Sequence, residues 1–379
     1  MKAGQLTKAE VERYSRQLVL REIGSEGQSR LKASSVLIVG AGGLGIPAAV
    51  YLAAAGVGRI GIVDGDTIER SNLHRQTIYS DADVGKPKAG VARDRLLAVN
   101  PHVSVLSNEA RLDSGNALSI LEGYDVILDC TDNFPARYLI NDACVFLHKP
   151  DVYASIFRFD GQASVFHADR GPCYRCLFPE PPPADTVQDC SEAGVLGVLP
   201  GILGSIQAAQ TINLLLGKGR SLVGRLLLFD AMDMSFSELR IGKNPQCPVC
   251  GVHPAVTKLI DYEEFCGTNA SPAKVAEVDA LTLKRLLDAG SRIKLLDVRE
   301  PHEYDLCHLP GSKLIPLEEL QQRMAELDPS EEVVVYCHVG VRSAKAVQFL
   351  SSNGFRRARN LMGGIRAWAD SVDPAMPVY

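Results

Sequence analysis

Two spacings of apolar residues alternate along the first part of the chain. Short apolar runs at 36–39, 60–63 and 124–129 are typical of strands buried on both faces of a sheet. Between them, the alanine-rich stretch 47–55 and the stretch 85–100 have the length and composition of helices. Strands that alternate with helices predict an α/β fold with a doubly wound, Rossmann-like sheet.

The first strand runs directly into a glycine-rich turn. Gly40, Gly42 and Gly45 follow the apolar run, so a strand turns sharply into a helix whose free amides face a phosphate. The next apolar run ends at Asp64, nineteen residues after Gly45, where a carboxylate meets a ribose hydroxyl in such folds. This pattern predicts nucleotide binding, and a dehydrogenase fits it equally well.

A basic loop beyond Asp64 separates the two possibilities. Asn72, Arg75 and Lys88 bring an amide and two cations towards the phosphate end of the nucleotide. Splitting a triphosphate needs such charge because negative charge builds on the oxygens around the α-phosphorus, whereas hydride transfer needs little. The alternative is a solvated charged loop, which would explain Lys88 more readily than Arg75.

Asp132 follows the predicted strand 124–129 and is a candidate magnesium ligand. The carboxyl ends of parallel strands converge on one ligand crevice, and Mg²⁺ prefers carboxylate, phosphate and water oxygens. The alternative role for Asp132 is that of an N-cap for a helix that begins near Pro135. The two interpretations are evenly balanced on these residues alone.

Two pairs of cysteines have the spacing that lets two thiolates chelate one ion. Cys173 and Cys176 form the first pair, and Cys247 and Cys250 form the second roughly seventy positions later. Together they supply the four sulfur ligands of a closed, structural zinc site. Redox chemistry is the alternative, but no thioredoxin-like pattern accompanies the pairs.

The stretch between the cysteine pairs combines a stiff connection, an apolar helix and a hairpin. Cys190 follows a proline-rich run and precedes the predicted helix 195–216, where a helix N-terminus would lower its pKa; the alternative is an inert buried thiol. Glycines, Pro200 and a polar face with Gln207 make this helix a core element rather than a membrane span. Residues 226–241 then predict a pair of strands.

A second domain follows a turn-rich linker. We expect one domain over 1–265, a linker over 266–276 and a further α/β domain over 277–379. In this further α/β domain, Cys337 ends a buried strand and lies at a helix N-terminus. The backbone amides there form a nest that stabilises a thiolate or persulfide. Only four residues separate Cys337 from Arg342, one fewer than cysteine phosphatases need, and this favours sulfane sulfur over phosphate.

Composition narrows the class of protein. The chain has 379 residues, a formal net charge of -5 and no basic run, which argues against nucleic-acid binding. Residues 1–30 do not resemble a signal peptide because charged residues fall where an apolar region would be needed. Ten cysteines without an export signal point to metal and sulfur chemistry in a reducing cytoplasm, with no membrane partner.

The combination of motifs over about residues 8–250 resembles the activating enzymes of ubiquitin-like sulfur carriers, such as the molybdopterin-synthase and thiamine-pathway adenylyltransferases. The resemblance implies that Arg16, Asn72, Arg75 and Lys88 contact ATP phosphates, that Asp132 binds magnesium, and that Arg16 reaches a partner subunit in a homodimer. Cys190 matches a position that forms a covalent link with the carrier in some relatives. The remaining implied ATP contacts are Gly40, Gly42, Gly43, Asp64, Ser71, Leu73, His74 and Asn133.

Residues 277–379 resemble a rhodanese domain, through the Cys337 loop and the later stretch 361–368. The resemblance implies that Cys337 carries a persulfide in a loop that includes Gly340, and that Arg342 holds either this loop or the sulfur donor. The alternative is an inactive rhodanese-like fold, and the retained cysteine argues against it.

Together the two resemblances imply the two-domain order of fused molybdopterin-synthase adenylyltransferase/sulfurtransferases. The expected reaction is adenylation of the C-terminal glycine of a ubiquitin-like sulfur carrier protein, followed by sulfur transfer from Cys337 to form a thiocarboxylate. The expected cofactors are ATP, Mg²⁺ and Zn²⁺, and the sulfur comes from a cysteine desulfurase or another donor. Two alternatives are an NAD-type oxidoreductase with a sulfur-binding appendage and a non-catalytic scaffold that binds a carrier.

Overall fold

The computed structural model describes residues 5–182, 194–267 and 275–377. The chain divides into two compact units, Met1–Asn269 and Ala270–Tyr379. Each unit has its own sheet and its own hydrophobic core.

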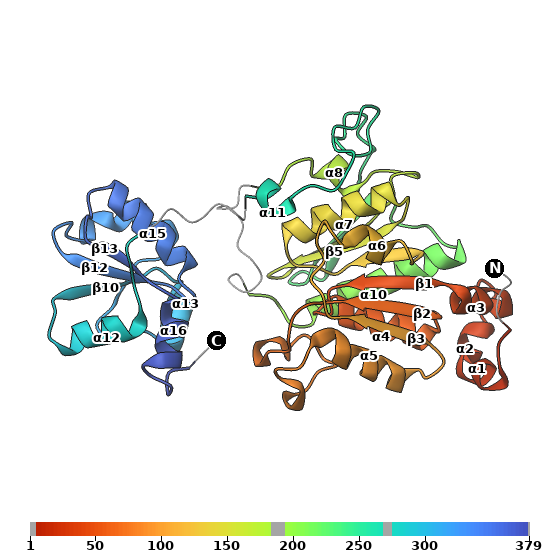
Figure 1. Ribbon diagram of the computed structural model, residues 1–379, viewed down its shortest axis with the longest axis horizontal. Coiled ribbons are helices and arrows are strands. Elements are labelled where there is room, and N and C mark those ends of the chain that lie inside the picture. Colours follow the sequence, from red (N-terminus) through yellow and green to blue (C-terminus); the bar gives the residue numbers. More distant parts are fainter. Residues whose placement is uncertain (1–4, 183–193, 268–274, 378–379) are drawn as a thin grey trace. The chain divides into compact units, whose positions relative to one another are not determined.

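The first unit is built on an eight-stranded sheet (Figure 1) in the order β3-β2-β1-β4-β5-β6-β7-β8. Neighbouring strands from β3 to β5 are parallel, which confirms the doubly wound arrangement, and β6 to β8 continue the sheet in antiparallel fashion. The predicted pair of strands at 226–241 is confirmed as β7 and β8. The strand bounds are β1 Ser35–Val39, β2 Arg59–Val63, β3 Ser104–Asn108, β4 Val126–Asp129, β5 Asp151–Phe157, β6 Asp160–Phe166, β7 Arg225–Asp230 and β8 Ser235–Arg240.

Helices cover both faces of this sheet, as continuous apolar strands require. One core packs the sheet against α4, α5 and α10, and a second core packs it against α6 and α7. The helix bounds in this unit are α1 Lys8–Arg13, α2 Ser15–Leu18, α3 Gly24–Ala33, α4 Gly45–Ala55, α5 Lys88–Val99, α6 Ala117–Leu121, α7 Phe134–Phe146, α8 Tyr174–Leu177, α10 Leu199–Leu216 and α11 Tyr262–Phe265.

The helix predicted over 195–216 begins later than expected. Val195 instead forms a β-bridge with Arg158, and α10 starts at Leu199 with Pro200 in its first turn, a position that tolerates the missing N–H. By length and composition alone α10 is long and apolar enough to cross a membrane. Half of it is buried inside the unit, where Leu199 and Leu203 belong to the core.

The second unit contains a five-stranded parallel sheet in the order β11-β10-β12-β13-β9. The predicted strand that ends at Cys337 is β12, and the predicted helix after it begins at Val341. The strand bounds are β9 Glu277–Val278, β10 Ile293–Asp297, β11 Lys313–Leu314, β12 Glu332–Tyr336 and β13 Ala358–Leu361. The helix bounds are α12 Ala280–Asp288, α13 Pro301–Leu306, α14 Leu320–Arg323, α15 Val341–Ser352 and α16 Gly364–Ser371.

Candidate active sites and cysteine cluster

The glycine turn connects β1 to α4 in a conformation that side chains would block. Gly40 has φ +99°, and a Cβ there would lie 2.7 Å from the carbonyl oxygen of Cys130. A Cβ on Gly45 would lie 1.9 Å from the carbonyl oxygen of Gly40. Glycine is therefore required at both ends of the turn, which leaves the backbone open to a ligand.

A cavity of about 1440 Å³ lies at the carboxyl ends of the parallel strands. It is large enough for a nucleotide together with part of a second substrate. Most of the residues predicted to bind the nucleotide line it, namely Gly40, Gly42, Gly43, Asp64, Asn72, Arg75, Lys88, Asp132 and Asn133.

Asp64 is tied to the glycine turn by its carboxylate. One oxygen accepts a hydrogen bond of 2.7 Å from the backbone amide of Ala41, and the other accepts one of 2.8 Å from the amide of Asp66. Burial raises the pKa of Asp64, although these amides and the Lys88 ammonium partly oppose the increase. The carboxylate thus connects the end of β2 to the turn after β1.

Lys88 does not belong to a solvated loop, so that interpretation is wrong. Its side chain is 9% exposed at the start of α5, and its ammonium lies 2.9 Å from the Asp66 carboxylate. Arg75 donates a hydrogen bond of 3.0 Å to the Ser71 carbonyl and lies 2.9 Å from the Nε2 atom of His74. Burial and the Arg75 charge lower the pKa of His74. Two cationic side chains therefore line one wall of the cavity.

The N-cap interpretation of Asp132 is wrong because Asn133 caps α7. The Asn133 side chain accepts a hydrogen bond of 3.0 Å from the amide of Ala136, and the helix begins at Phe134 with Pro135 in its first turn. Asp132 is exposed at the cavity wall, with its carboxylate available to a cation. A carboxylate that lines the same cavity as two cationic side chains suits a magnesium–phosphate pair.

Four predicted contacts do not line the cavity, namely Arg16, Ser71, Leu73 and His74. Arg16 is exposed on α2. The cavity includes residues that sequence reasoning missed. Arg137 is 7% exposed and donates to the Thr131 carbonyl at 3.3 Å, one helical turn after Asn133. This helical spacing was the available signal for it.

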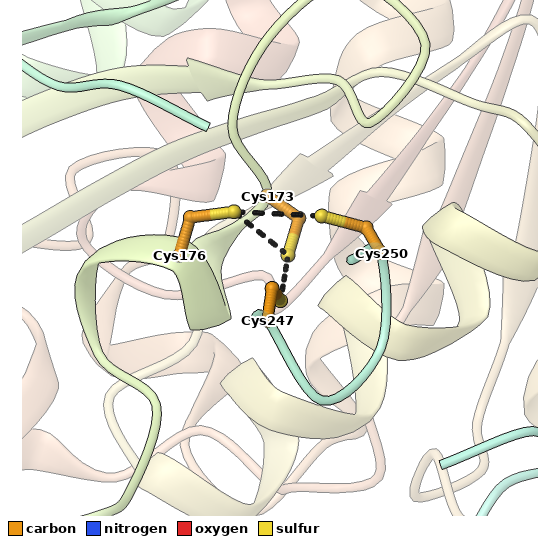
Figure 2. A group of neighbouring side chains, drawn as sticks. All are labelled: Cys173, Cys176, Cys247 and Cys250. Atoms are coloured by element: carbon orange, nitrogen blue, oxygen red, sulfur yellow. Dashed lines mark hydrogen bonds between the residues drawn. The ribbon is translucent and has the colours of Figure 1, made fainter. Parts of the chain in front are cut away.

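The two cysteine pairs come together as predicted (Figure 2). Sγ of Cys173 lies 3.5 Å from that of Cys247, and Sγ of Cys176 lies 3.4 Å from that of Cys250. All four sulfurs lie within 4.8 Å of one another. A tetrahedral Zn–S bond of about 2.3 Å corresponds to sulfur separations of about 3.8 Å, so the donor set fits a four-sulfur zinc site.

In the second unit, Cys337 lies in a buried cradle of hydrogen-bond donors. The amide of Gly340 donates to its sulfur at 3.2 Å, and the Ser343 hydroxyl lies 3.3 Å from the same sulfur. Gly340 has φ +97° and caps α15, as the predicted loop requires. Such donors stabilise a sulfur anion. Cys190, the other candidate thiol, lies outside the described residues.

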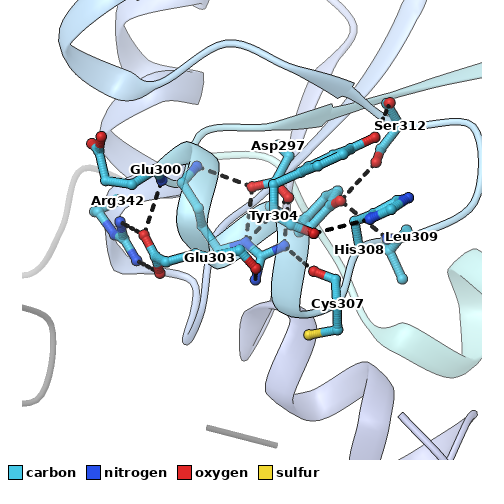
Figure 3. Close-up of polar contacts among 11 residues, drawn as sticks. Asp297, Glu300, Glu303, Tyr304, Cys307, His308, Leu309, Ser312 and Arg342 are labelled. Carbon is cyan, nitrogen blue, oxygen red and sulfur yellow. Dashed lines mark hydrogen bonds and ion pairs between the residues drawn. The ribbon is translucent and has the colours of Figure 1, made fainter. Parts of the chain in front are cut away.

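Arg342, which follows the Cys337 loop in the sequence, faces Glu303 of α13 (Figure 3). Its guanidinium makes two hydrogen bonds of 2.7 Å to the carboxylate of Glu303, and both side chains are buried. Of the two roles implied for Arg342, this geometry favours support of the loop. Glu303 is a residue that sequence reasoning missed, since 39 positions separate it from Arg342.

Comparisons with known proteins agree with the division of the chain into two units. Residues 14–249 match the model of the ThiF family, and residues 279–371 match that of the rhodanese-like domain. The probable adenylyltransferase/sulfurtransferase MoeZ of Mycobacterium tuberculosis is 46% identical, and the alignment covers 100% of this chain and 97% of that protein. The adenylyltransferase and sulfurtransferase MOCS3 of Culex quinquefasciatus is 43% identical, with 99% and 90% covered.

A crystal structure of E. coli MccB with ATP shares the fold of the first unit. It is 25% identical, has a TM-score of 0.56, and the alignment covers 65% of this chain and 75% of MccB. No feature of these relatives favours the dehydrogenase alternative. The chain belongs to the ThiF family and carries a rhodanese-like domain after its ThiF domain.

Proposed function

We propose that the protein adenylates the C-terminal glycine of a small ubiquitin-like sulfur carrier protein and then converts the activated carboxyl group to a thiocarboxylate. The names of its two full-length relatives contain both activities, adenylyltransferase and sulfurtransferase. The observation that carries the proposal is the cavity at the glycine turn, which Arg75, Lys88 and Asp132 line together.

In the first step, a carboxylate oxygen of the carrier attacks the α-phosphorus of ATP. The bond from this phosphorus to the bridging oxygen breaks, pyrophosphate leaves, and an acyl adenylate remains. Negative charge grows on the phosphate oxygens during the step, and preorganised cations stabilise it. Arg75 and Lys88 supply these cations, and Asp132 would hold a Mg²⁺ ion that neutralises phosphate charge.

In the second step, the terminal sulfur of a Cys337 persulfide attacks the acyl carbon, and AMP leaves. This forms an acyl disulfide between the carrier and Cys337. A second thiolate, for which Cys190 is the candidate, attacks the Cys337 sulfur, so the thiocarboxylate leaves with the electron pair and a disulfide remains. A cellular dithiol reduces that disulfide, and a cysteine desulfurase or another persulfide donor recharges Cys337.

We also propose that the protein works as a homodimer in the cytoplasm. Two exposed apolar residues follow α2, the helix that carries Arg16: Val19 is 78% and Leu20 50% exposed, and such residues favour burial against a second subunit. Zinc in the cysteine cluster would have a structural role, because four sulfur ligands leave no open position.

ATP–pyrophosphate exchange with carrier proteins that end in Gly-Gly tests the proposal. We expect carrier-dependent exchange in the wild type and its loss in Asp132→Ala. Asp94→Ala is the matched control, since Asp94 is exposed on α5 and pairs with the neighbouring Arg93. Absence of exchange with every carrier, in a folded protein, would contradict the proposed activity.

A further inference from the structure

One wall of the cavity in the first unit comes from the segment just before its C-terminal boundary. We call residues 259–266 the strap. Ile260, Asp261, Tyr262 and Glu263 of the strap line the same cavity as the glycine turn. The strap lies beyond the matched ThiF residues, which end at 249.

The order of the strands tells which part of a nucleotide faces the strap. The glycine turn and Asp132 follow β1 and β4, Asp64 follows β2, and the cavity-lining loop 109–115 follows β3. Because neighbouring strands lie about 4.8 Å apart, loop 109–115 is roughly 10 Å from the phosphate end, about the length of a nucleoside. The strap contacts this loop, so it lies on the base side.

Two contacts join the strap to loop 109–115. Arg111 and Glu263 form an ion pair of 3.1 Å, and the Ser114 hydroxyl donates a hydrogen bond to the carbonyl of Ile260. Leu112 of the loop and Ile260 of the strap both line the cavity, among polar and charged neighbours that include Glu109, Asp113 and Asp261. Apolar contacts combined with a few polar groups are typical of sites that hold a planar base.

A buried network holds the other side of the strap. The Tyr262 hydroxyl donates a hydrogen bond of 2.8 Å to the carboxylate of Asp142 on α7. Arg175 donates two more to that carboxylate, at 2.9 Å and 2.8 Å. Asp142 and Arg175 are 0% and 1% exposed, so their pairing is undisturbed by solvent.

Arg175 belongs to the cysteine cluster, since it lies between Cys173 and Cys176. Its guanidinium also lies 4.4 Å from the ring centroid of Phe265, a strap residue, in a cation–π contact. One side chain of the cysteine loop therefore meets the strap through Asp142 and through Phe265.

We propose that the strap forms the base-side wall of the nucleotide site, and that Arg175 is a positioning residue that docks it. The inference rests on the proposed use of ATP. It gives the cysteine cluster a further role, because Arg175 between the cysteines sets the position of the strap. It also assigns recognition of the base to a segment that lies outside the matched ThiF residues.

The test compares ATP with inorganic tripolyphosphate, which presents the phosphates without the base. In the full-length protein we expect Ile260→Ala to weaken ATP binding about tenfold, because an apolar contact is lost, and to leave tripolyphosphate binding unchanged. Tyr262→Phe and Arg175→Lys should show the same selective loss. Arg75→Ala should weaken binding of both ligands.

Val252→Ala is the matched control, because Val252 is 71% exposed between the cysteine cluster and the strap and does not line the cavity. Unchanged ATP affinity in folded Ile260→Ala and Tyr262→Phe would overturn the proposal, as would an equal loss for both ligands. Tyr262→Phe keeps the test decisive if Arg175→Lys fails to fold. A wild type that binds ATP but shows no carrier-dependent exchange would contradict the proposed function and leave the strap assignment intact.

Discussion

Arg342 and Glu303 form a buried, doubly hydrogen-bonded ion pair at the start of the helix that follows the Cys337 loop, with both bonds 2.7 Å long. The pair joins α15, which follows the loop, to α13. Since the carboxylate occupies the guanidinium fork, Arg342 acts on the loop's position, and loss of Glu303 removes both of these hydrogen bonds from a buried guanidinium.

Glu303→Ala should destabilise the second unit by about 3–5 kcal/mol, because breaking a buried ion pair by removing one of its members is costly. Trp368 is the chain's only tryptophan and is buried in this unit, so its fluorescence during urea unfolding measures the effect. Glu331→Ala is the control: Glu331 forms an exposed ion pair with Lys294 and should change stability by less than about 1 kcal/mol. Equal midpoints for the two variants would contradict the prediction.

Ser343→Ala should slow sulfur transfer and leave adenylation unchanged. The Ser343 hydroxyl is 3.3 Å from the Cys337 sulfur and 2.7 Å from Oδ1 of Asn360, so its single proton must turn to the sulfur anion. A hydrogen bond to a charged group contributes about 1.5–3 kcal/mol, or roughly 10- to 100-fold in rate. Thiosulfate–cyanide sulfur transfer and ATP–pyrophosphate exchange measure the two activities separately. Ser352→Ala, at the exposed end of the same helix, should match the wild type.

The cysteine cluster should bind one zinc ion per chain. Cys247→Ser should lose the metal and destabilise the first unit by on the order of 5 kcal/mol or more, because metal binding energy is folding energy in such sites. Elemental analysis and thermal unfolding measure these effects. Cys307→Ser, a half-buried cysteine of the second unit, should keep its zinc. Full zinc content in Cys247→Ser would show that the four sulfurs are not the ligands.

Glu10 should make the stability of the N-terminal helices depend on pH. Burial alone would raise its pKa, but hydrogen bonds from Lys32 and Thr7 outweigh burial and lower the pKa from 4.5 to about 2. A depressed pKa stabilises the folded state above about pH 4.5, and this contribution is lost as the pH falls towards 2.

The measurement for Glu10 is the difference in urea stability between wild type and Glu10→Gln from pH 3 to pH 7. We expect the wild type to be more stable at pH 7 and the difference to shrink as the pH falls. Glu12→Gln is the control, since Glu12 is an exposed residue of the same helix. A difference that grows at low pH would have the wrong sign for a carboxylate with a depressed pKa.

The features that could be predicted from the sequence follow from rules that act over a few neighbouring residues. The glycine turn and Asp64 follow from strand and turn chemistry within a single connection, and the structure places them at one cavity. The helix boundary at Leu199 was missed because Val195 pairs with Arg158, a tertiary contact that overrides an apolar run. The alternative in which Asp132 caps α7 is off by one residue, because Asp and Asn are both good caps.

The sequence by itself determined the alternation of strands and helices, the phosphate-facing turn, the chelating spacing of each cysteine pair and the cradle that follows Cys337. Each depends on residues a few positions apart, where backbone geometry limits the outcomes. The packing of whole elements confirms that the two cysteine pairs meet. It alone pairs Glu303 with Arg342 and carries the strap to the cavity, where Tyr262 bonds to Asp142. Those contacts join residues far apart in the chain, and their partners carry no periodic signal because their positions depend on how whole elements pack.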